Sequence, residues 1–197
     1  MGKIFYLMGK SSSGKDSIYK RIIERNSFNL KPIIGYTTRP IREGEREGVE
    51  YYFVDNKKLN EMQLKGIVIE RRDYNTVFGI WSYFTADDGQ INIMENSYLL
   101  IGTLEAYEKI RGYFGEGNVV PIFINVDDGI RLKRALEREM LQETPKYAEM
   151  CRRFLVDEKD FSTENKQRCG IMKEFENDDL EKCIEDIEQA IKEELEK

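Results

Sequence analysis

A glycine-rich turn between an apolar run and a helical pattern is the feature that most limits how this chain can fold. Residues 4–8 are continuously apolar, as expected for a strand that is buried on both faces of a parallel sheet. The turn GKSSSGKDS occupies residues 9–17, and residues 15–25 show the apolar spacing of a helix. A strand, a tight turn and a helix in this order predict an α/β fold.

The same alternation returns in the second half of the chain. Apolar, partly β-branched runs predict strands at residues 98–101, 119–126 and 171–175. Helical patterns follow them, starting at Thr103, at Asp127 or Asp128, and at Asp178 or Asp179, and Pro145 divides the middle pattern into two helices. These repeated units predict a parallel sheet with helices on both faces.

Residues 36–97 have a different texture, rich in aromatic, charged and turn residues. Residues 32–35 form a short strand candidate before them, and pieces of β character occur at 51–54, 67–71 and 76–84. Asp55 is placed to cap a short helix that ends before Gly66. We therefore expect an inserted subdomain here, with Trp81 and Phe84 in its core.

Composition excludes several kinds of chemistry. The chain has 197 residues, a net charge of −6 and no histidine. The absence of histidine rules out a Ser–His–Asp triad, a Cys–His pair and a histidine-ligated metal site. The negative net charge argues against a general nucleic-acid binder, which normally carries a positive excess. The chemistry must use carboxylates, Lys, Arg, hydroxyls, backbone amides or a hard cation.

The cysteines and apolar runs predict where the protein works. Cys151, Cys169 and Cys183 are odd in number and widely spaced, which argues against a disulfide framework or a zinc site. The early apolar run is too short for a signal sequence or a membrane span. We expect a cytoplasmic protein that binds neither nucleic acid nor membrane.

The turn at residues 9–17 matches the phosphate-binding pattern G-x-x-x-x-G-K-[ST] except at one position. Its backbone N–H groups and the start of the helix would surround a polyphosphate, and Lys15 would reach the β and γ phosphates. Asp16 stands where Ser or Thr normally binds Mg²⁺, so it is the candidate metal ligand. The alternative is an ordinary turn whose serines cap the helix. The candidate ATP contacts are Gly9, Ser11, Ser12, Ser13, Gly14, Lys15, Asp16 and Ser17.

A second motif runs from TTRPIREGE at residues 37–45 to GVEYYFV at residues 48–54. Arg39 and Arg42 lie three apart on a segment stiffened by Pro40, so both can bind one phosphate as bidentate donors. Tyr51 can add a hydroxyl. The alternative is a solvated basic loop, although its place after a phosphate-binding turn favours the binding interpretation.

With GKSSSGK, TTRPIREGE and GVEYYFV in this order, and with VIE at residues 68–70 and ENDDL at 176–180, the chain resembles the guanylate kinase family over nearly its whole length. The resemblance implies a P-loop kinase core, a parallel sheet flanked by helices, at residues 1–35 and 97–197. It further implies an inserted mixed α/β nucleoside-monophosphate-binding subdomain at 36–96 and a helical lid at about 138–158. The implied reaction is phosphorylation of GMP to GDP with ATP and Mg²⁺.

The resemblance also assigns residues to the acceptor. Arg39, Arg42 and Tyr51 fall on the ligands of the GMP phosphate, and Glu70 falls on the carboxylate that binds guanine. That role is chemically sound, since the N1–H and N2–H donors of guanine suit one carboxylate, whereas adenine presents an acceptor there. The alternative for Glu70 is a surface charge beside Arg71 and Arg72. The other candidate acceptor-site residues are Thr38 and Phe78.

By the same resemblance, the lid segment would place several cations near the ATP phosphates. Arg134 and Arg138 are four apart and share one helix face, and Arg153 matches the second lid arginine of the family. With Lys15 they are the candidate catalytic residues, because phosphoryl transfer depends on positioning and on cations beside the transferring oxygens. Each lid arginine could instead belong to a solvated helix face. Asn177 is a further candidate nucleotide contact.

Several positions depart from the family pattern, at Asp16, Gly35, Phe78, Ile80 and Gly102. Gly35, Phe78 and Ile80 replace hydroxyl-bearing residues near GMP, and Gly102 lies where the family has an Asp-x-Asp. One hypothesis is that Asp16 supplies the metal ligand that the segment around Gly102 lacks. Two alternatives to guanylate kinase therefore stay open. One is a kinase for another nucleoside monophosphate or small phosphoacceptor, and the other is a catalytically weak binding module.

The intact phosphate-binding turn weighs against the binding-module alternative. Such modules usually lose the lysine of the turn, whereas Gly14 and Lys15 are both present here. The leading prediction is thus an enzyme that binds ATP and GMP. For its assembly we expect a monomer or a homodimer.

Overall fold

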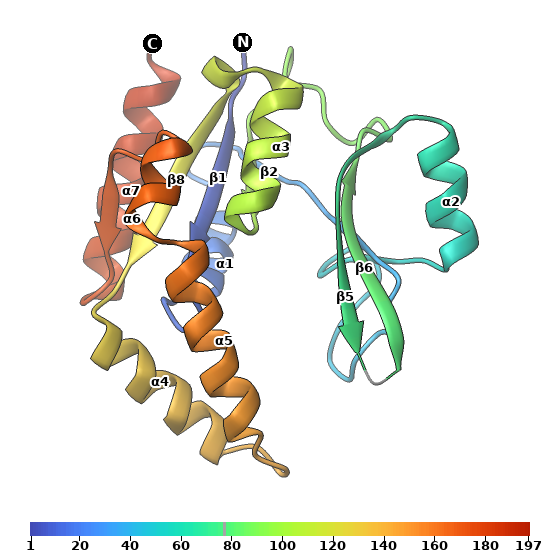
Figure 1. Ribbon diagram of the computed structural model, residues 1–197. Coiled ribbons are helices and arrows are strands. Elements are labelled where there is room, and N and C mark those ends of the chain that lie inside the picture. Colours follow the sequence, from blue (N-terminus) through green and yellow to red (C-terminus); the bar gives the residue numbers. More distant parts are fainter. Residues whose placement is uncertain (77) are drawn as a thin grey trace.

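A five-stranded parallel sheet forms the centre of the larger part of the molecule, as the computed structural model of residues 1–76 and 78–197 shows (Figure 1). The strand order is β2-β7-β1-β8-β9, so the first strand of the chain lies in the middle of the sheet. Parallel pairing joins all neighbours. The strands are β1 (Ile4–Gly9), β2 (Lys31–Pro32), β7 (Tyr98–Ile101), β8 (Val119–Asn125) and β9 (Glu174–Glu176).

Helices cover both faces of this sheet, as the sequence predicts. The alternating side chains of β1 point to opposite faces, with Tyr6 on one and Leu7 on the other. Tyr6 packs with α3 (Leu104–Phe114), whereas Leu7 packs with α1 (Lys15–Arg25) and α7 (Leu180–Leu195). Both faces of the sheet are therefore buried under helices, which leaves the ends of its strands as the places where polar side chains can lie.

A second sheet is built entirely from residues 36–86 and has the order β4-β3-β6-β5. The helix α2 (Asn56–Leu64) packs on it, and Leu59, Met62 and Phe84 are buried between them. Phe84 is thus a core residue, as predicted. The strands are β3 (Tyr36–Thr37), β4 (Tyr52–Phe53), β5 (Val68–Thr76) and β6 (Gly79–Ala86).

Two long helices extend beyond the larger sheet and lie opposite the hairpin of β5 and β6 (Figure 1). They are α4 (Asp128–Met140) and α5 (Tyr147–Asp160), and Pro145 lies between them as predicted. A short α6 (Thr163–Arg168) follows, and a 3₁₀ turn (Glu116–Asn118) precedes β8. The sequence pattern did not predict α6. No helix in the described part of the chain is long and apolar enough to span a membrane.

The capped helices agree with the predictions most closely. Asp55 accepts a hydrogen bond from the backbone N–H of Lys58 and begins α2, while Thr103, Asp127 and Asp179 cap α3, α4 and α7. The cap residues have short polar side chains that satisfy free N–H groups at a helix start. The local sequence therefore places the starts of α2 and α3, and it limits those of α4 and α7 to two neighbouring aspartates each.

In the smaller sheet, the strand expected at residues 67–71 continues to Thr76, and the one expected at 76–84 begins only at Gly79. Two strand predictions in the larger sheet are also wrong in extent. The strand expected at residues 32–35 stops at Pro32, because the backbone N–H of Ile34 donates to the Gln90 side chain instead of continuing the ladder. The strand expected at residues 171–175 begins only at Glu174. The N–H of Ile171 is bonded to the Lys166 carbonyl, which closes the end of α6.

Candidate functional site

The phosphate-binding turn is held tightly against the segment that follows β9. Gly14 has a φ of 85°, and a Cβ atom there would overlap the side-chain nitrogen of Asn177. That amide donates a 2.7 Å hydrogen bond to the Ser13 carbonyl. Only glycine combines this left-handed conformation with so close an approach. Asn177, which the sequence predicts to contact the nucleotide, thus holds the turn in place through the Ser13 carbonyl.

The turn offers unused donors to an anion. The start of α1 has no side-chain cap, so its first N–H groups remain available. The hydroxyl oxygens of Ser12 and Ser13 are buried, and no described residue bonds to them. Buried polar groups without partners are rare and often indicate a site for a ligand or water. These features suit the oxygen atoms of a polyphosphate.

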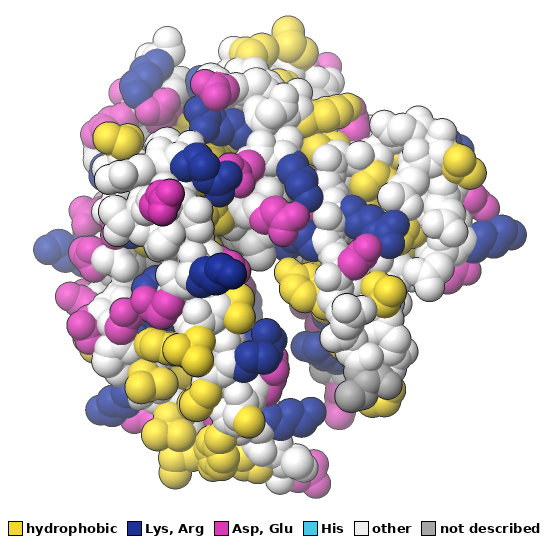
Figure 2. Space-filling view, in the orientation of Figure 1, with side chains coloured by type: hydrophobic (Ala, Val, Ile, Leu, Met, Phe, Trp, Pro, Cys, Tyr) yellow, Lys and Arg dark blue, Asp and Glu magenta, His cyan; other side chains and the backbone are white. Residues whose placement is uncertain are grey.

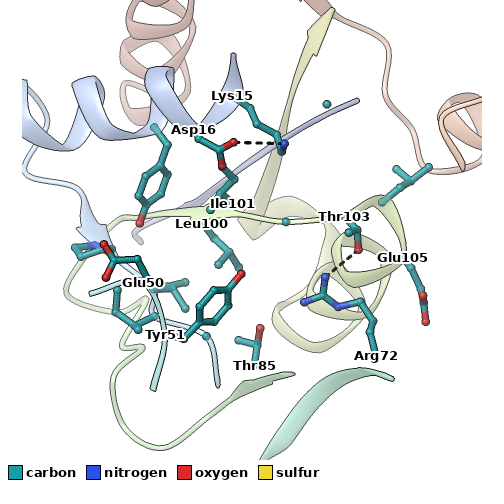
Figure 3. Close-up of a pocket in the computed structure, with 18 of the residues that line it drawn as sticks. Lys15, Asp16, Glu50, Tyr51, Arg72, Thr85, Leu100, Ile101, Thr103 and Glu105 are labelled. Carbon is teal, nitrogen blue, oxygen red and sulfur yellow. Dashed lines mark hydrogen bonds and ion pairs between the residues drawn. The ribbon is translucent and has the colours of Figure 1, made fainter. Parts of the chain in front are cut away.

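The turn opens onto a cleft of about 1180 Å³ that lies between the two sheets. Figure 2 shows the molecule hollowed here, with Lys and Arg side chains on both walls. Lys15 and Asp16 enter the cleft from the turn, and Tyr51, Arg72 and Thr85 enter it from the second sheet (Figure 3). Of the sequence-predicted site residues, the described lining also includes Gly9 and Ser11.

Arg39 is engaged by a carboxylate of its own segment. Its side chain is only 3% exposed and forms two hydrogen bonds with Glu45, at 2.7 and 2.5 Å. Its Nε–H donates to the Tyr83 hydroxyl at 3.1 Å. The bonds to Glu45 raise the pKa of Arg39, and the bonds from Arg39 lower the pKa of Glu45. A further N–H of Arg39 Nη1 donates to the Pro40 carbonyl at 2.9 Å. A phosphate could therefore bind Arg39 only through the second N–H of Nη2, for which the described residues provide no acceptor.

The other predicted acceptor residues lie at varied distances from the cleft. Arg42 is exposed, and its backbone N–H donates to Glu45. Thr38 accepts a 2.8 Å bond from the N–H of Ser82 across the second sheet. Phe78 is 81% exposed at the hairpin tip, where it stacks on Trp81. None of Arg42, Thr38 and Phe78 is among the described residues that line the cleft.

Glu70 lies behind Arg72 rather than at the cleft surface. Its side chain is fully buried, with 0% exposed, and its oxygens accept from Arg72 Nε at 2.9 Å and Arg72 Nη2 at 3.2 Å. Thr85 adds a 2.9 Å hydrogen bond from its hydroxyl. Arg72 also donates from Nη1 to the Thr103 hydroxyl at 3.3 Å. Arg72 therefore forms part of one wall of the cleft, and Glu70 holds it from behind.

Sequence reasoning assigned no role to Arg72 or Thr85. A signal for Arg72 was available, because residues two apart on a strand point to the same face, and Glu70 and Arg72 have that spacing. No local signal identifies Thr85, since it comes from the neighbouring strand, opposite Glu70 in the antiparallel ladder. Its contact with Glu70 depends on the pairing of β5 with β6.

Carboxylates of α5 contact the phosphate-binding turn from the other side. Asp157 Oδ2 accepts a 2.7 Å hydrogen bond from the backbone N–H of Ser11. Glu158 accepts from Lys10 and from Arg131, both at 2.6 Å. Arg131 is buried and also donates to the Ser11 carbonyl at 3.1 Å. These contacts link the turn to α4 and α5, and the sequence pattern did not reveal them.

The predicted lid arginines differ in their surroundings. Arg134 donates to the Asn177 carbonyl at 3.2 Å, so it reaches the turn through Asn177. Arg138 is exposed on α4, and Arg153 is exposed on α5 with Glu149 at 3.7 Å. Of the four candidate catalytic residues, Lys15 alone is among the described residues that line the cleft.

The metal-binding capacity of the site rests on Asp16. Its side chain is 83% exposed to the cleft, and its Oδ2 lies 3.7 Å from Lys15 Nζ. No group of three or more acidic or cysteine side chains in the described residues could hold a metal by itself. Mg²⁺ commonly binds through one or two carboxylates together with waters and substrate phosphates. Asp16 fits that incomplete kind of site.

Gly102 and Gly35 both depart from the family pattern, but they differ in whether the structure has room for a side chain. A Cβ atom on Gly102 would overlap the hydroxyl of Tyr6, which is buried and donates to the Thr103 carbonyl at 3.1 Å. Gly102 is therefore required by packing. At Gly35 an added Cβ would meet the Tyr51 ring at 3.8 Å, which is ordinary contact. A side chain at position 35 would be tolerated.

Comparisons with known proteins identify the family of the chain. The family model for guanylate kinase matches residues 1–194. The guanylate kinase of Malacoplasma penetrans is 29% identical over 171 residues, covering 85% of this chain and 75% of the relative. That of Wolbachia sp. subsp. Brugia malayi is 27% identical over 195 residues, covering 96% and 92%.

A solved structure supports the same assignment at the level of the fold. The crystal structure of guanylate kinase from Anaplasma phagocytophilum matches with a TM-score of 0.65 and 24% identity, covering 98% of this chain and 86% of that chain. The likeness thus includes both sheets and the helices between them. The match of the guanylate kinase family model to residues 1–194 shows that this chain belongs to the guanylate kinase family.

Proposed function

We propose that the protein transfers the γ-phosphoryl group of ATP to GMP. The observation that carries the proposal is the phosphate-binding turn, which directs Lys15 and an uncapped helix start into the cleft that Tyr51 and Arg72 also line. Donor and acceptor can therefore bind in one enclosed space. Family membership supports the same activity, and it favours neither a binding module nor another acceptor.

The chain's own groups supply positioning and charge. The N–H groups at the start of α1 and the hydroxyls of Ser12 and Ser13 hold the phosphates of ATP, and Lys15 neutralises charge on the transferring group. Arg134 supports the turn through Asn177. Arg138 and Arg153 stay predictions, since they would have to approach when the helices α4 and α5 close over ATP.

On the acceptor side, Tyr51 provides a hydroxyl in the cleft, and its burial raises the pKa of that hydroxyl, so it remains a donor at neutral pH. Arg39 is proposed to contact the GMP phosphate with its remaining N–H on Nη2, and Arg42 with its exposed guanidinium. Thr38 and Phe78 stay predicted acceptor-site residues. The division into core, acceptor subdomain and lid is proposed with the bounds given above.

Asp16 is the proposed protein ligand for Mg²⁺ bound with ATP. When present, the ion supplies charge stabilisation for the phosphate oxygens. Ser is the usual residue of the motif at this position, so replacing Asp16 with Ser tests this role. The test is informative here because Gly102 stands where the family has an Asp-x-Asp. We expect kcat for phosphoryl transfer to fall and more Mg²⁺ to be needed for half-maximal rate. A fully active Asp16→Ser enzyme with unchanged Mg²⁺ dependence would contradict the assignment.

The activity itself is tested by ADP production from MgATP with GMP, dGMP, AMP, UMP and CMP, each against a blank without acceptor. We expect strong turnover with GMP and little with AMP, UMP or CMP. Turnover with a different acceptor alone would keep the kinase reaction and reject GMP as substrate. No turnover with any acceptor, despite GMP binding by calorimetry, would reject the kinase proposal and leave a binding module.

The remaining expectations stay predictions. The cytoplasmic location is expected from the spacing of the cysteines and from the short early apolar run. Light scattering on the purified protein would decide between a monomer and a homodimer.

A further inference from the structure

We propose that Arg72 is the side chain that binds the acceptor's base, and that it selects a 6-oxopurine through the base's acceptor edge while Glu70 acts as its positioning residue. This rests on the proposed function, because it names the group that selects the acceptor. It departs from the sequence-based expectation that the Glu70 carboxylate itself contacts guanine.

Glu70 has no surface with which to contact a base. Its side chain is completely buried, and its two oxygens together accept bonds from Arg72 Nε, Arg72 Nη2 and the Thr85 hydroxyl. The N1–H and N2–H donors of guanine would have to displace a buried charged partner to reach it. Breaking such a pair strongly disfavours that arrangement, since it leaves a charge without its partner.

Arg72, in contrast, has donors to spare. A guanidinium carries five N–H groups, and three of them go to Glu70 and Thr103. The described residues provide no hydrogen-bond acceptor for the other two, which belong to Nη1 and Nη2. The side chain remains 17% exposed and lines the cleft. One N–H on each terminal nitrogen suits the paired acceptors O6 and N7 of guanine, which are the commonest specific contact of arginine with a base.

The charge state of the pair supports this use. Burial, the largest single influence, lowers the pKa of Arg72, but the charge and hydrogen bonding of Glu70 together with Tyr6 and Tyr74 outweigh it, so the pKa is raised above its ordinary value. Arg72 therefore stays a cation and a pure donor. Adenine carries an amino donor at C6, which would face the Arg72 N–H groups without an acceptor between them.

The location of Arg72 favours the base over the phosphate of the acceptor. Figure 3 shows Lys15 and Asp16 at one end of the cleft, and Arg72 and Thr85 away from them. The acceptor phosphate must meet the γ-phosphoryl group near Lys15. The base of the same molecule then extends toward the wall formed by Arg72.

A consequence concerns the 2-amino group of guanine. Because Glu70 is covered, no carboxylate in this wall reads that group, so hypoxanthine should bind nearly as well as guanine. The acceptor class is therefore 6-oxopurine nucleoside monophosphates, GMP and IMP alike, with AMP excluded.

The test measures binding of GMP, IMP and AMP by calorimetry to the unmodified protein and to Arg72→Gln. Arg71→Gln is the matched control, because Arg71 is the adjacent arginine and bonds instead to Asp73 and Gln63. We expect the unmodified protein to bind GMP and IMP within about threefold of each other and AMP far more weakly. Arg72→Gln should lose about 10- to 100-fold on GMP and IMP with AMP unchanged.

Each other outcome overturns the proposal. Equal losses for all three nucleotides would make Arg72 a phosphate ligand. Unchanged binding would show that Arg72 does not contact the acceptor. A strong preference of the unmodified protein for GMP over IMP would show that Glu70 reads the 2-amino group directly.

Arg72→Gln leaves a buried carboxylate unpaired and could fail to fold. The double variant Glu70→Gln/Arg72→Gln removes both charges and retains amide hydrogen bonding, so it gives the same binding comparison without that charge. Glu70→Gln alone tests positioning. It should lower the GMP-to-AMP affinity ratio while AMP binding stays unchanged, whereas a merely structural role would weaken both equally.

Binding and turnover separate the two proposals. If GMP and IMP bind through Arg72 but no ADP forms with either, the kinase proposal fails and the assignment of Arg72 stands. If GMP is phosphorylated while Arg72→Gln keeps full base selectivity, the kinase proposal stands and the assignment of Arg72 fails.

Discussion

The two sides of the cleft pair their cations with carboxylates in different ways. On the phosphate-binding side, Lys10 and Arg131 are bonded to Glu158, which lies 148 and 27 residues away in the sequence. On the acceptor side, Arg39 is bonded to Glu45 and Arg72 to Glu70, only six and two residues away. The first set joins separate elements, whereas the second set stays within one segment.

This difference determines what motion can change. If α5 moves relative to the turn, its carboxylates leave the turn and free the backbone N–H of Ser11 for a phosphate oxygen. If the second sheet moves as a unit, the pairs Arg39–Glu45 and Arg72–Glu70 travel with it and stay intact. Closure of the cleft would thus change which charged groups are paired on the ATP side. On the acceptor side it would mainly change the position of pairs that stay intact.

The largest expected effect comes from Lys15, the cation of the turn that points into the cleft. We expect Lys15→Ala to lower kcat by about two to three orders of magnitude, because removal of one preorganised charge at a developing anion has that size. The measurement is steady-state ADP production at saturating GMP. Lys133→Ala on exposed α4 is the control and should retain full activity. A decrease of less than tenfold would place the catalytic charge elsewhere.

Glu45 tests the pairs within the acceptor segment. Glu45→Gln removes the charge that partners buried Arg39, and we expect unfolding at pH 7 to require about 1.5–3 kcal/mol less. Arg39 lowers the pKa of Glu45, so this stabilisation is complete above the ordinary pKa of 4.5 and is lost as pH falls through the lowered value.

Urea unfolding at pH 7 and at pH 3 measures this contribution. The difference between the unmodified protein and Glu45→Gln should shrink at the lower pH, while the neighbouring Glu43→Gln should behave like the unmodified protein at both. A difference that is independent of pH would mean that Glu45 acts through packing and not through its charge.

Asp157 gives the smallest expected effect. Its carboxylate accepts a hydrogen bond from the Ser11 N–H. An Asn at this position would accept that bond with a neutral oxygen, which makes a weaker hydrogen bond than a carboxylate does. We expect Asp157→Asn to lower the KM for ATP by about three- to tenfold, in line with the net value of one hydrogen bond. Asp160→Asn, one turn further along the same helix, is the control. A raised KM would instead make Asp157 part of the ATP site.

The sequence predicts the fold well where one short segment contains the whole signal. The strand at Tyr98–Ile101 and the caps at Asp55 and Thr103 are examples, since their causes lie within a few residues. It predicts α6 and the final strand poorly, because their limits depend on the bond between Ile171 and Lys166.

The site follows the same rule. The phosphate-binding turn is a contiguous motif, and the structure places Lys15 in the cleft as that motif requires. The acceptor wall is assembled from strands that meet only in the folded sheet, so Thr85 and its bond to Glu70 have no trace in local sequence. The predicted ligands Arg39 and Glu70 are present, yet their partners determine what they can bind.

The contact between Tyr6 and Gly102 makes the order of substitutions matter. An aspartate introduced at position 102 alone would collide with the Tyr6 ring and hydroxyl, and Tyr6→Phe would not be enough because the ring carbon Cζ also lies 2.9 Å from the added Cβ. Residue 6 must first become small. A carboxylate at position 102 therefore requires a change at residue 6 as well, and packing couples these two positions, which lie 96 residues apart in the sequence.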